Sequence, residues 1–493
     1  MNALLIYPEF PETHWNFKHV LKLISKRATE PPLGLLTVSS FLPGTWNRKL
    51  IDMNVSKLHN KDIQWADLVF ISGMDIQKSS FKNVLKRCSS FGTRIIAGGP
   101  MVTQNHDEFP EIDHFILGEA ENTIQSFLDD LAKGKALKVY KSTDFPEITN
   151  TPVPDWSLIN MRNYVFMDLQ YSRGCPFDCE FCSIKTLFGN RLRLKDAKQF
   201  ITELESLYSA GWTGNVFIVD DNFIGNKTKL KSSLLPELIN WQRKNHYPFI
   251  FNTEVSINAA DDEELIDMMI ESGFTSCFIG IETPEEKSLA ECGKKQNISV
   301  DMLGVIKKMQ RKGLNVSGGF IIGFDSDEED IFSKQYDFIQ KSGIVNAMVG
   351  LLNAPPGTRL YKRLKAENRI LNAMTGDNTD GSLNFITKMD SRKLIDNYKM
   401  LVQKLYSPKN YLERINTFLS EYKMPEQKFT IRENIRLITA VKVILKLGFL
   451  QISGKYYFWK MIFHTIRNYP SKLALAITLS VYGFHFRKIA NSL

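Results

Sequence analysis

Residues 171–182 read YSRGCPFDCEFC, and they place Cys175, Cys179 and Cys182 within eight positions of a chain that has six cysteines in 493 residues. A CxxxCxxC loop of this kind brings three thiolates to one centre. Structural zinc sites normally recruit a fourth Cys or His at similar spacing, but no His occurs between Cys182 and His246. The loop therefore favours an iron–sulfur cluster with one iron left open. A zinc site completed by a distant His, or three unrelated cysteines, are the weaker alternatives.

The cysteine stretch follows the first of six apolar segments that alternate with helical patterns. DDEELIDMMIESG, residues 261–273, is one such helical pattern. Strands and helices in alternation predict a parallel sheet, and six such units predict a partial (β/α)6 barrel. The six segments are VFMDLQYS, NVFIVDDN, FIFNTEVS, CFIGIETP, GGFIIGFD and AMVGLLNAPPG.

Almost every strand of this series ends on a polar group. After the cysteine loop, the strand ends carry Asp220, Asp221 and Asn222, then Glu254, Glu282, Asp325 and Asn353. Barrels of this kind place their chemistry at the carboxyl-terminal rim, so we expect the cysteines and these side chains to face one cavity. A salt bridge at the barrel rim is the structural alternative for Glu254 and Glu282.

The first 135 residues hold a separate series of apolar segments: NALLIYP, RKLIDMN, LVFISG, RIIAGGP and HFILGE. Their alternation with amphipathic stretches predicts a Rossmann-like, doubly wound parallel sheet. Ligands of such sheets bind beyond the carboxyl ends of the strands, where small residues allow close backbone approach. The candidate ligand contacts, for which ordinary turns are the alternative, are Ser72, Gly73, Gly98, Gly99, Pro100, Gly118 and Glu119.

The chain is too long for one hydrophobic core, and its patterns divide it into three domains. We expect the first domain at residues 1–136 and the barrel at residues 164–360, joined by a Pro-interrupted linker at residues 137–163. After residue 360 the strand signal fades, and residues 361–493 are expected to form a mainly helical domain.

The net charge of +8 is concentrated in the tail of this helical domain. Residues 431–493 carry ten Lys and Arg against Glu433 alone, which leaves 52 basic and 53 acidic residues elsewhere. The tail also carries six aromatic residues. An anionic membrane surface or an acidic partner is therefore a candidate contact of the tail. A helical subdomain whose Lys and Arg side chains are solvated is the plainer alternative. The six aromatic residues are Phe458, Trp459, Phe463, Tyr469, Phe484 and Phe486.

The remaining cysteines and the amino-terminal residues indicate a reducing compartment. Six unevenly clustered cysteines do not resemble a disulfide framework, and MNALLIYPEF lacks the features of a signal peptide, so we expect a cytoplasmic protein.

Cys88 and Cys277 lie on helix and strand patterns and are interpreted as buried small hydrophobes. Cys292 is interpreted as a surface or loop residue.

These motifs together resemble a known family. The CxxxCxxC loop, the aromatic Phe181 before its last cysteine and the strand-end carboxylates resemble radical S-adenosylmethionine (SAM) enzymes. PPLGLL and GGP, in the first domain, resemble the cobalamin-binding domain joined to many such enzymes. The stretches NTEVSINAADDEEL, IGIETPEE, GGFIIGFDSD and AMVGLLNAPPGTRLY further resemble the subgroup of hopanoid 2-methylase-like proteins, which has a helical carboxyl-terminal domain. The resemblance covers roughly residues 1–360.

The resemblance implies roles for the candidate residues. Cys175, Cys179 and Cys182 would hold a 4Fe-4S cluster, and SAM would bind the open iron beside Phe181. By the same resemblance, the methionyl amino group would contact Asp220, Asp221 and Asn222, which replace the usual Gly-Gly-Glu. Glu254 and Glu282 would contact the ribose hydroxyls or the methionyl ammonium. Gly319 through Gly323 would line the adenine. The small-residue loops of the first domain would bind cobalamin. His14 and His106 lack the DxHxxG context and are interpreted as loop histidines, so cobalt would have no protein histidine.

The implied activity is a cobalamin-dependent radical SAM methyltransferase acting on an unactivated carbon. A polycyclic lipid such as a hopanoid is the implied substrate, with an electron donor such as flavodoxin or ferredoxin and peripheral contact of the tail with a membrane. A radical SAM enzyme that uses cobalamin for a rearrangement or ring contraction is one alternative, and a non-catalytic cobalamin or redox sensor is another. No recognised nucleic-acid module accompanies the basic tail, so no nucleic-acid partner is expected.

Overall fold

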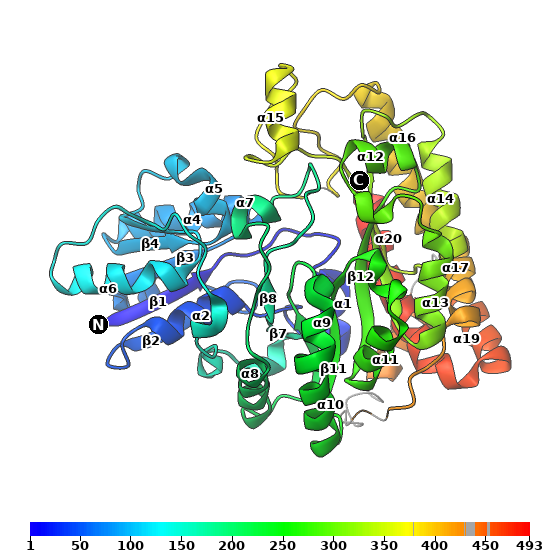
Figure 1. Ribbon diagram of the computed structural model, residues 1–493, viewed down its shortest axis with the longest axis horizontal. Helices are drawn as coiled ribbons and strands as arrows, with labels where there is room; N and C mark the ends of the chain where they lie inside the picture. The colour runs from blue at the N-terminus through cyan, green and yellow to red at the C-terminus, as the bar shows by residue number, and fades with distance from the viewer. Residues whose placement is uncertain (378, 428, 430–438, 451–453) are drawn as a thin grey trace.

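The computed structural model describes residues 1–377, 379–427, 429, 439–450 and 454–493. Figure 1 shows the first sheet beside the strands of the second, with the carboxyl-terminal helices on the far side of the second sheet. Both sheets are entirely parallel.

The first sheet confirms the Rossmann-like prediction and extends it by one strand. Its order is β2 (Asn47–Asp52), β1 (Asn2–Tyr7), β3 (Leu68–Ser72), β4 (Arg94–Gly98), β5 (His114–Leu117) and β6 (Val139–Lys141). Strand β6 pairs with β5. It lies in the segment that we interpreted as a linker, because a three-residue strand leaves no clear apolar run.

Helices cover both faces of this sheet, as alternating side chains require. Leu4 and Ile6 of β1 pack in the core that includes Phe81 of α4 (Lys78–Ser90). Ala3 and Leu5 pack in the other core, which includes residues of α2 (Leu33–Phe41) and α6 (Ile124–Ala132). The carboxyl edge of the sheet is therefore left as the place where a ligand can approach.

The second sheet confirms the predicted partial barrel. Helices on its outer side include α8 (Ala197–Ser209), α10 (Leu235–Lys244), α11 (Glu263–Glu271), α13 (Met302–Lys312) and α14 (Ile331–Ser342). The strand order is β14 (Ala347–Leu351), β13 (Asn315–Ile322), β12 (Phe274–Glu282), β11 (Phe249–Val255), β10 (Gly214–Ile218) and β7 (Met167–Leu169), so each of the six predicted segments supplies one strand.

Strand β11 shows how the barrel interior is formed. Phe249, Phe251 and Val255 are buried in the core, whereas Ile250, Asn252 and Glu254 alternate with them and line an internal cavity. A strand places successive side chains on opposite faces, so its inward face carries the polar residues.

The carboxyl-terminal domain is mainly helical, as predicted. No helix in the described ranges combines the length and apolar character needed to cross a bilayer. The domain contains α15 (Arg359–Ala366), α16 (Ser391–Leu405), α17 (Pro408–Glu421), η12 (Ile444–Leu450), α19 (Lys455–Asn468) and α20 (Leu473–Ser492).

The aromatic residues of the tail divide between core and surface. Phe458, Phe484 and Phe486 are buried, so these three serve packing, and Phe463 is 67% exposed. Trp459 and Tyr469 are half-buried. Residues 431–438 and 451–453 of the predicted basic tail lie outside the described residues.

Helix α20 holds an early segment of the chain in place. The ring of His14 stacks on Phe486 with centroids 4.2 Å apart, and His485 Nε2 lies 3.1 Å from the carbonyl oxygens of Thr13 and His14. Burial lowers the pKa of His14 to about 3 and that of His485 to about 4, so both imidazoles are neutral. His14, which we interpreted as a loop histidine, is therefore a buried contact.

Candidate active site

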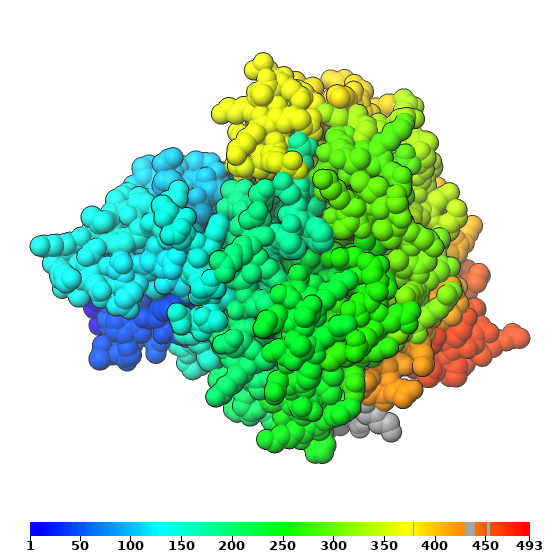
Figure 2. Space-filling view, in the orientation of Figure 1, coloured from blue at the N-terminus to red at the C-terminus, as the bar shows by residue number. Residues whose placement is uncertain are grey.

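A cavity of about 2230 Å³ lies between the first sheet and the barrel and extends to the carboxyl-terminal helices. Small-molecule pockets are commonly about 300–1,000 Å³, so this cavity has room for more than one large ligand. Figure 2 shows the first domain packed against the barrel. The cavity lining includes Tyr7, Phe10 and Met74 from the first domain, Asp221, Glu254 and Phe278 from the barrel, and Val443, Leu475 and Tyr482 from the last domain.

The three motif cysteines lie in the loop between β8 (Ser172–Arg173) and α7 (Ile184–Phe188). All three are half-buried and none forms a disulfide, and Cys182 N donates to the carbonyl of Cys179 at 3.1 Å. Among the described residues, no three His, Cys, Asp or Glu side chains converge on a point that would hold one metal ion. Three cysteine ligands of a four-iron cluster bind different irons and need no common point, so this donor set fits a cluster.

A buried ion cluster fixes the start of the cysteine loop to the first domain. Arg173, two residues before Cys175, contacts Glu119 at 2.6 Å and Glu121 at 2.8 Å, and Arg193 contacts Glu119 at 2.7 Å. Two guanidinium groups thus hold the carboxylate of Glu119, which we had predicted as a cofactor contact.

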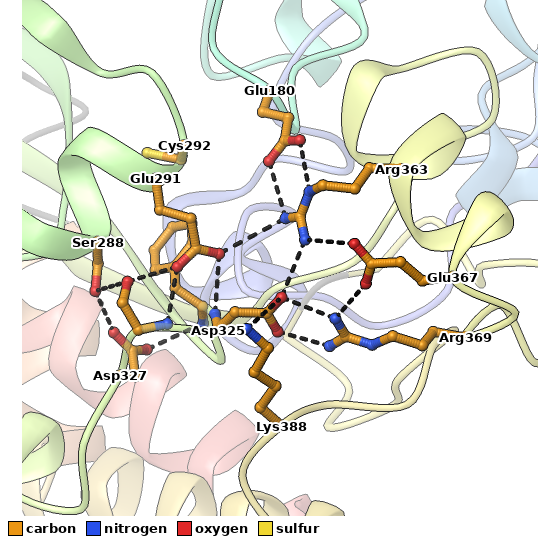
Figure 3. A network of polar contacts seen from close by, with 12 residues as sticks. Glu180, Ser288, Glu291, Cys292, Asp325, Asp327, Arg363, Glu367, Arg369 and Lys388 are labelled. Carbon is orange, nitrogen blue, oxygen red and sulfur yellow. Dashed lines mark hydrogen bonds and ion pairs between the residues drawn. The ribbon is translucent and has the colours of Figure 1, made fainter.

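A second network holds the middle of the loop (Figure 3). Glu180, between Cys179 and Phe181, receives two hydrogen bonds from Arg363 of α15, at 2.8 and 3.0 Å. Arg363 and Arg369 also bind Asp325, at 3.0 and 2.6 Å. Burial raises the pKa of Asp325, but hydrogen bonds from Arg369 and Arg363 outweigh this effect and lower it to about 2.

Only part of the predicted ring of strand-end groups faces the cavity. Asp220, Asp221 and Glu254 line it, whereas Asn222, Glu282, Asp325, Asn353 and the three motif cysteines lie outside its lining. The expectation of one shared cavity was therefore wrong for the cysteines and for these four side chains. Arg363 and Arg369 hold Asp325, and Asn353 donates to the carbonyls of Leu351 and Ser382.

Glu282 is held in a strained position at the end of β12. Its φ is 64°, in the region that favours glycine, and its carboxylate pairs with Lys294 Nζ at 2.6 Å. This is the salt bridge that we weighed as the alternative for Glu282. Lys294 itself escaped the sequence analysis, because nothing in its local pattern separates it from a surface lysine.

The residues Asp220, Asp221 and Asn222 support the loops around them. Asp220 accepts from Tyr171 N at 2.8 Å and from the Ser172 hydroxyl at 2.5 Å, and Asp221 accepts from Gly174 N at 3.1 Å. Asn222 accepts from Ser256 N at 3.1 Å. Burial raises the pKa of Asp220 to about 7 and that of Asp221 to about 6.

Further carboxyl groups line the cavity near Glu254, and the sequence analysis missed two of them. Glu30 and Asp168 both face the cavity, and Asp168 Oδ1 is buried with no hydrogen-bond partner. Burial raises the pKa of Glu30 to about 7 and that of Asp168 well above its usual value. The available signals were an acid inside the apolar segment VFMDLQYS and an acid directly before PPLGLL.

The raised pKa of Glu254 can be tested through the pH dependence of the protein's stability. Burial and the nearby Asp221 raise the pKa of Glu254 to about 8. Because the folded state favours the neutral acid, stability is full below the unfolded pKa of about 4.3 and falls as pH rises through about 8. We expect Glu254→Gln to gain stability over the wild type across this range, by roughly 5 kcal/mol at pH 9. Urea unfolding at several pH values measures it, and a pH-independent difference would contradict it.

The predicted cobalamin loops lie at the carboxyl edge of the first sheet, outside the cavity lining. Gly99 has φ 92°, and a Cβ there would lie 2.3 Å from Ser72 Oγ, so only glycine fits. A Cβ on Gly118 would meet nothing within 4 Å, so the chain is open at this position. The cobalamin contacts at Ser72, Gly73, Gly98, Gly99, Pro100 and Gly118 stay predictions.

The remaining predicted SAM contacts surround the end of β13. Phe181 lies 6.3 Å from Phe324, centroid to centroid, and Gly323 has φ 109°. Gly319 packs on the ring of Phe278, where a Cβ would come within 2.7 Å.

The other cysteines have structural roles. Cys88 and Cys277 are buried, as predicted. The surface assignment of Cys292 was wrong, because it is buried and its carbonyl accepts from Glu180 N at 2.8 Å.

Two family models match the chain. The radical SAM superfamily matches residues 169–338, which include the cysteine loop. A domain of unknown function matches residues 358–493, which cover most of the helical domain.

Known relatives extend the match over nearly the whole chain. An uncharacterized methyltransferase of Synechocystis sp. is 37% identical over 99% of this chain and 91% of its own length. The hopanoid C-2 methylase of Rhodopseudomonas palustris is 32% identical over 83% of this chain and 78% of its own. The radical SAM methyltransferase TsrM of Kitasatospora setae, solved with cobalamin and a 4Fe-4S cluster, aligns with a TM-score of 0.64 over 100% of this chain and 99% of its own. Its 11% identity makes this a likeness of fold.

Proposed function

This chain belongs to the radical SAM family of methyltransferases, and we propose that it is a cobalamin-dependent enzyme that methylates an unactivated carbon of a large apolar molecule. A hopanoid or another polycyclic lipid fits this description. The hopanoid C-2 methylase among its relatives and the width of the cavity support the choice of substrate.

The observation that carries the proposal is the cavity itself. Trp15, Phe217 and Phe278 line it together with aliphatic side chains from all three domains. Burial of an apolar substrate against such walls releases about 25 cal/mol for each Å² removed from water. The carboxyl groups of Glu254, Glu30 and Asp168, which line the cavity, supply a few fixed hydrogen-bonding groups for a cofactor amine or a substrate hydroxyl.

The loop cysteines would hold the cluster, and the open edge of the first sheet would hold cobalamin. When bound, these groups together with SAM supply the radical chemistry and the methyl group. The protein holds these groups in position relative to the substrate. Arg173 and Arg363 hold the cysteine loop from two sides, so its position relative to the cavity is fixed by charge-assisted hydrogen bonds.

Product analysis distinguishes methyl transfer from a cobalamin-dependent rearrangement. Protein purified without oxygen should bind cobalamin and, with a chemical reductant, convert SAM into both 5′-deoxyadenosine and S-adenosylhomocysteine, with a methylated product. A rearrangement would give deoxyadenosine without S-adenosylhomocysteine, and a sensor would give neither. A flavodoxin or ferredoxin should replace the chemical reductant. Lipid extracts from cells with and without the gene then identify the methylated molecule.

A further inference from the structure

An unusual apolar face lies on two helical segments of the last domain. Val441, Leu445, Phe449 and Leu450 are 51–72% exposed in the helical segment 439–450, and Tyr456, Phe463 and Ile466 of α19 are 49–67% exposed. The spacing of 441, 445 and 449 follows one side of a helix, as does that of 456, 463 and 466. These seven residues are called the apolar face below. Scattered exposed apolar residues are ordinary, but two aligned stripes indicate a binding surface.

The two stripes form one continuous surface. Trp459 Nε1 donates to the carbonyl of Gly448 at 3.0 Å, and the ring of Trp459 lies 5.5 Å from Phe449 and 6.1 Å from Phe463, centroid to centroid. Trp459 thus bridges η12 and α19. Helix α19 lies at the outer margin of the molecule, away from the first domain (Figures 1 and 2).

The charge within the two helical segments that carry the apolar face has a single sign. Lys442 and Lys446 flank the first stripe, and Lys455, Lys460 and Arg467 flank the second. No Asp or Glu occurs between residues 434 and 493. Aromatic and aliphatic residues ringed by cations are the pattern of segments that lie in the headgroup region of anionic bilayers.

We propose that the apolar face docks on an anionic lipid bilayer. Its residues would enter the headgroup boundary while the five cations contact lipid phosphates. A second copy of the chain is a poorer occupant, because self-pairing of this face would bring the like charges of its two segments together.

The same helical segment connects the surface with the cavity. Ala440 and Val443 line the cavity, and Val443 is 2% exposed, while Val441 and Leu445 point outward. A helix with its side chains is about 10–12 Å across, so docking would bring this end of the cavity close to the bilayer. This consequence rests on the proposed function, whereas the docking itself does not.

Vesicle flotation tests the proposal on the full-length protein. Vesicles of phosphatidylcholine mixed with phosphatidylglycerol should carry the wild type upward, and pure phosphatidylcholine should not. The triple variant Phe449→Ser, Leu450→Ser, Phe463→Ser should bind at least about ten-fold more weakly, because each apolar side chain loses its buried site. Added salt should weaken binding further, since the cations are exposed.

A matched variant controls for lost surface hydrophobicity. Phe91→Ser, Leu371→Ser, Met400→Ser removes exposed apolar residues elsewhere and should float as the wild type does. Equal flotation of both triple variants, or no flotation of the wild type, would overturn the proposal. Self-association of the wild type that the first variant abolishes, without vesicle binding, would assign the face to a second copy and also overturn it. Flotation does not depend on catalytic turnover. A negative flotation result would therefore not contradict the proposed methyl transfer.

Discussion

Replacing Cys179 by alanine is expected to abolish SAM cleavage while the protein stays folded. Each of the three thiolates would bind a separate iron, so losing one removes a cluster ligand. The rate of SAM cleavage should fall by more than the roughly 10–100-fold that follows from removing a residue that only hydrogen-bonds to a metal ligand. Iron content, electron paramagnetic resonance of the reduced cluster and deoxyadenosine formation measure it.

Cys292→Ala is the matched control for this prediction. Cys292 lies next to the loop, but it contacts Glu180 through its backbone carbonyl, which alanine retains. We expect it to keep about four irons per chain. Retained SAM cleavage in Cys179→Ala would remove the basis of the cluster assignment.

Arg173→Met is expected to cost about 3–5 kcal/mol of stability, because it leaves buried carboxylates at Glu119 and Glu121 without their shared partner. Only 3% of the Glu119 side chain and 12% of that of Arg173 are exposed, so water cannot replace the lost contact. Urea unfolding measures the stability. Reconstitution with iron and sulfide should also give a lower cluster content, because the loop start is released.

Arg191→Met makes the same Arg-to-Met replacement at an exposed ion pair, so its loss of stability is the comparison for Arg173→Met. The pair of Arg191 with Glu147 is 3.4 Å long and lies on the surface, with 82% of the Arg191 side chain exposed. Such pairs contribute at most about 1 kcal/mol. Similar losses in Arg173→Met and Arg191→Met would show that the buried ion cluster does not hold the domains together.

The sequence was sufficient to predict the strands, because buried strands between amphipathic helices leave a local pattern. All six barrel segments and five of the first-sheet strands were found in this way. Strand β6 was missed because it has three residues, of which only Tyr140 is buried. Its place is fixed by pairing with β5, and no pattern within the segment itself reveals that partner.

The predicted site was less complete because distant partners decide what a charged residue does. Asp325 ends a strand in the same way as Glu254, yet arginines 38 and 44 positions away hold Asp325, while Glu254 faces the cavity without a salt bridge. Glu119 is likewise held by Arg193, 74 positions later. Local sequence marks such residues as strand ends, but their partners become visible only in the fold.

The contact of His485 with the carbonyls of Thr13 and His14 joins positions 472 and 471 residues apart. Thr13, Trp15 and Phe17 line the cavity, as does Tyr482 of the same helix as His485. During translation, the early part of this wall leaves the ribosome long before its counterpart has been made. The chamber can therefore be completed only after helix α20 has been synthesised.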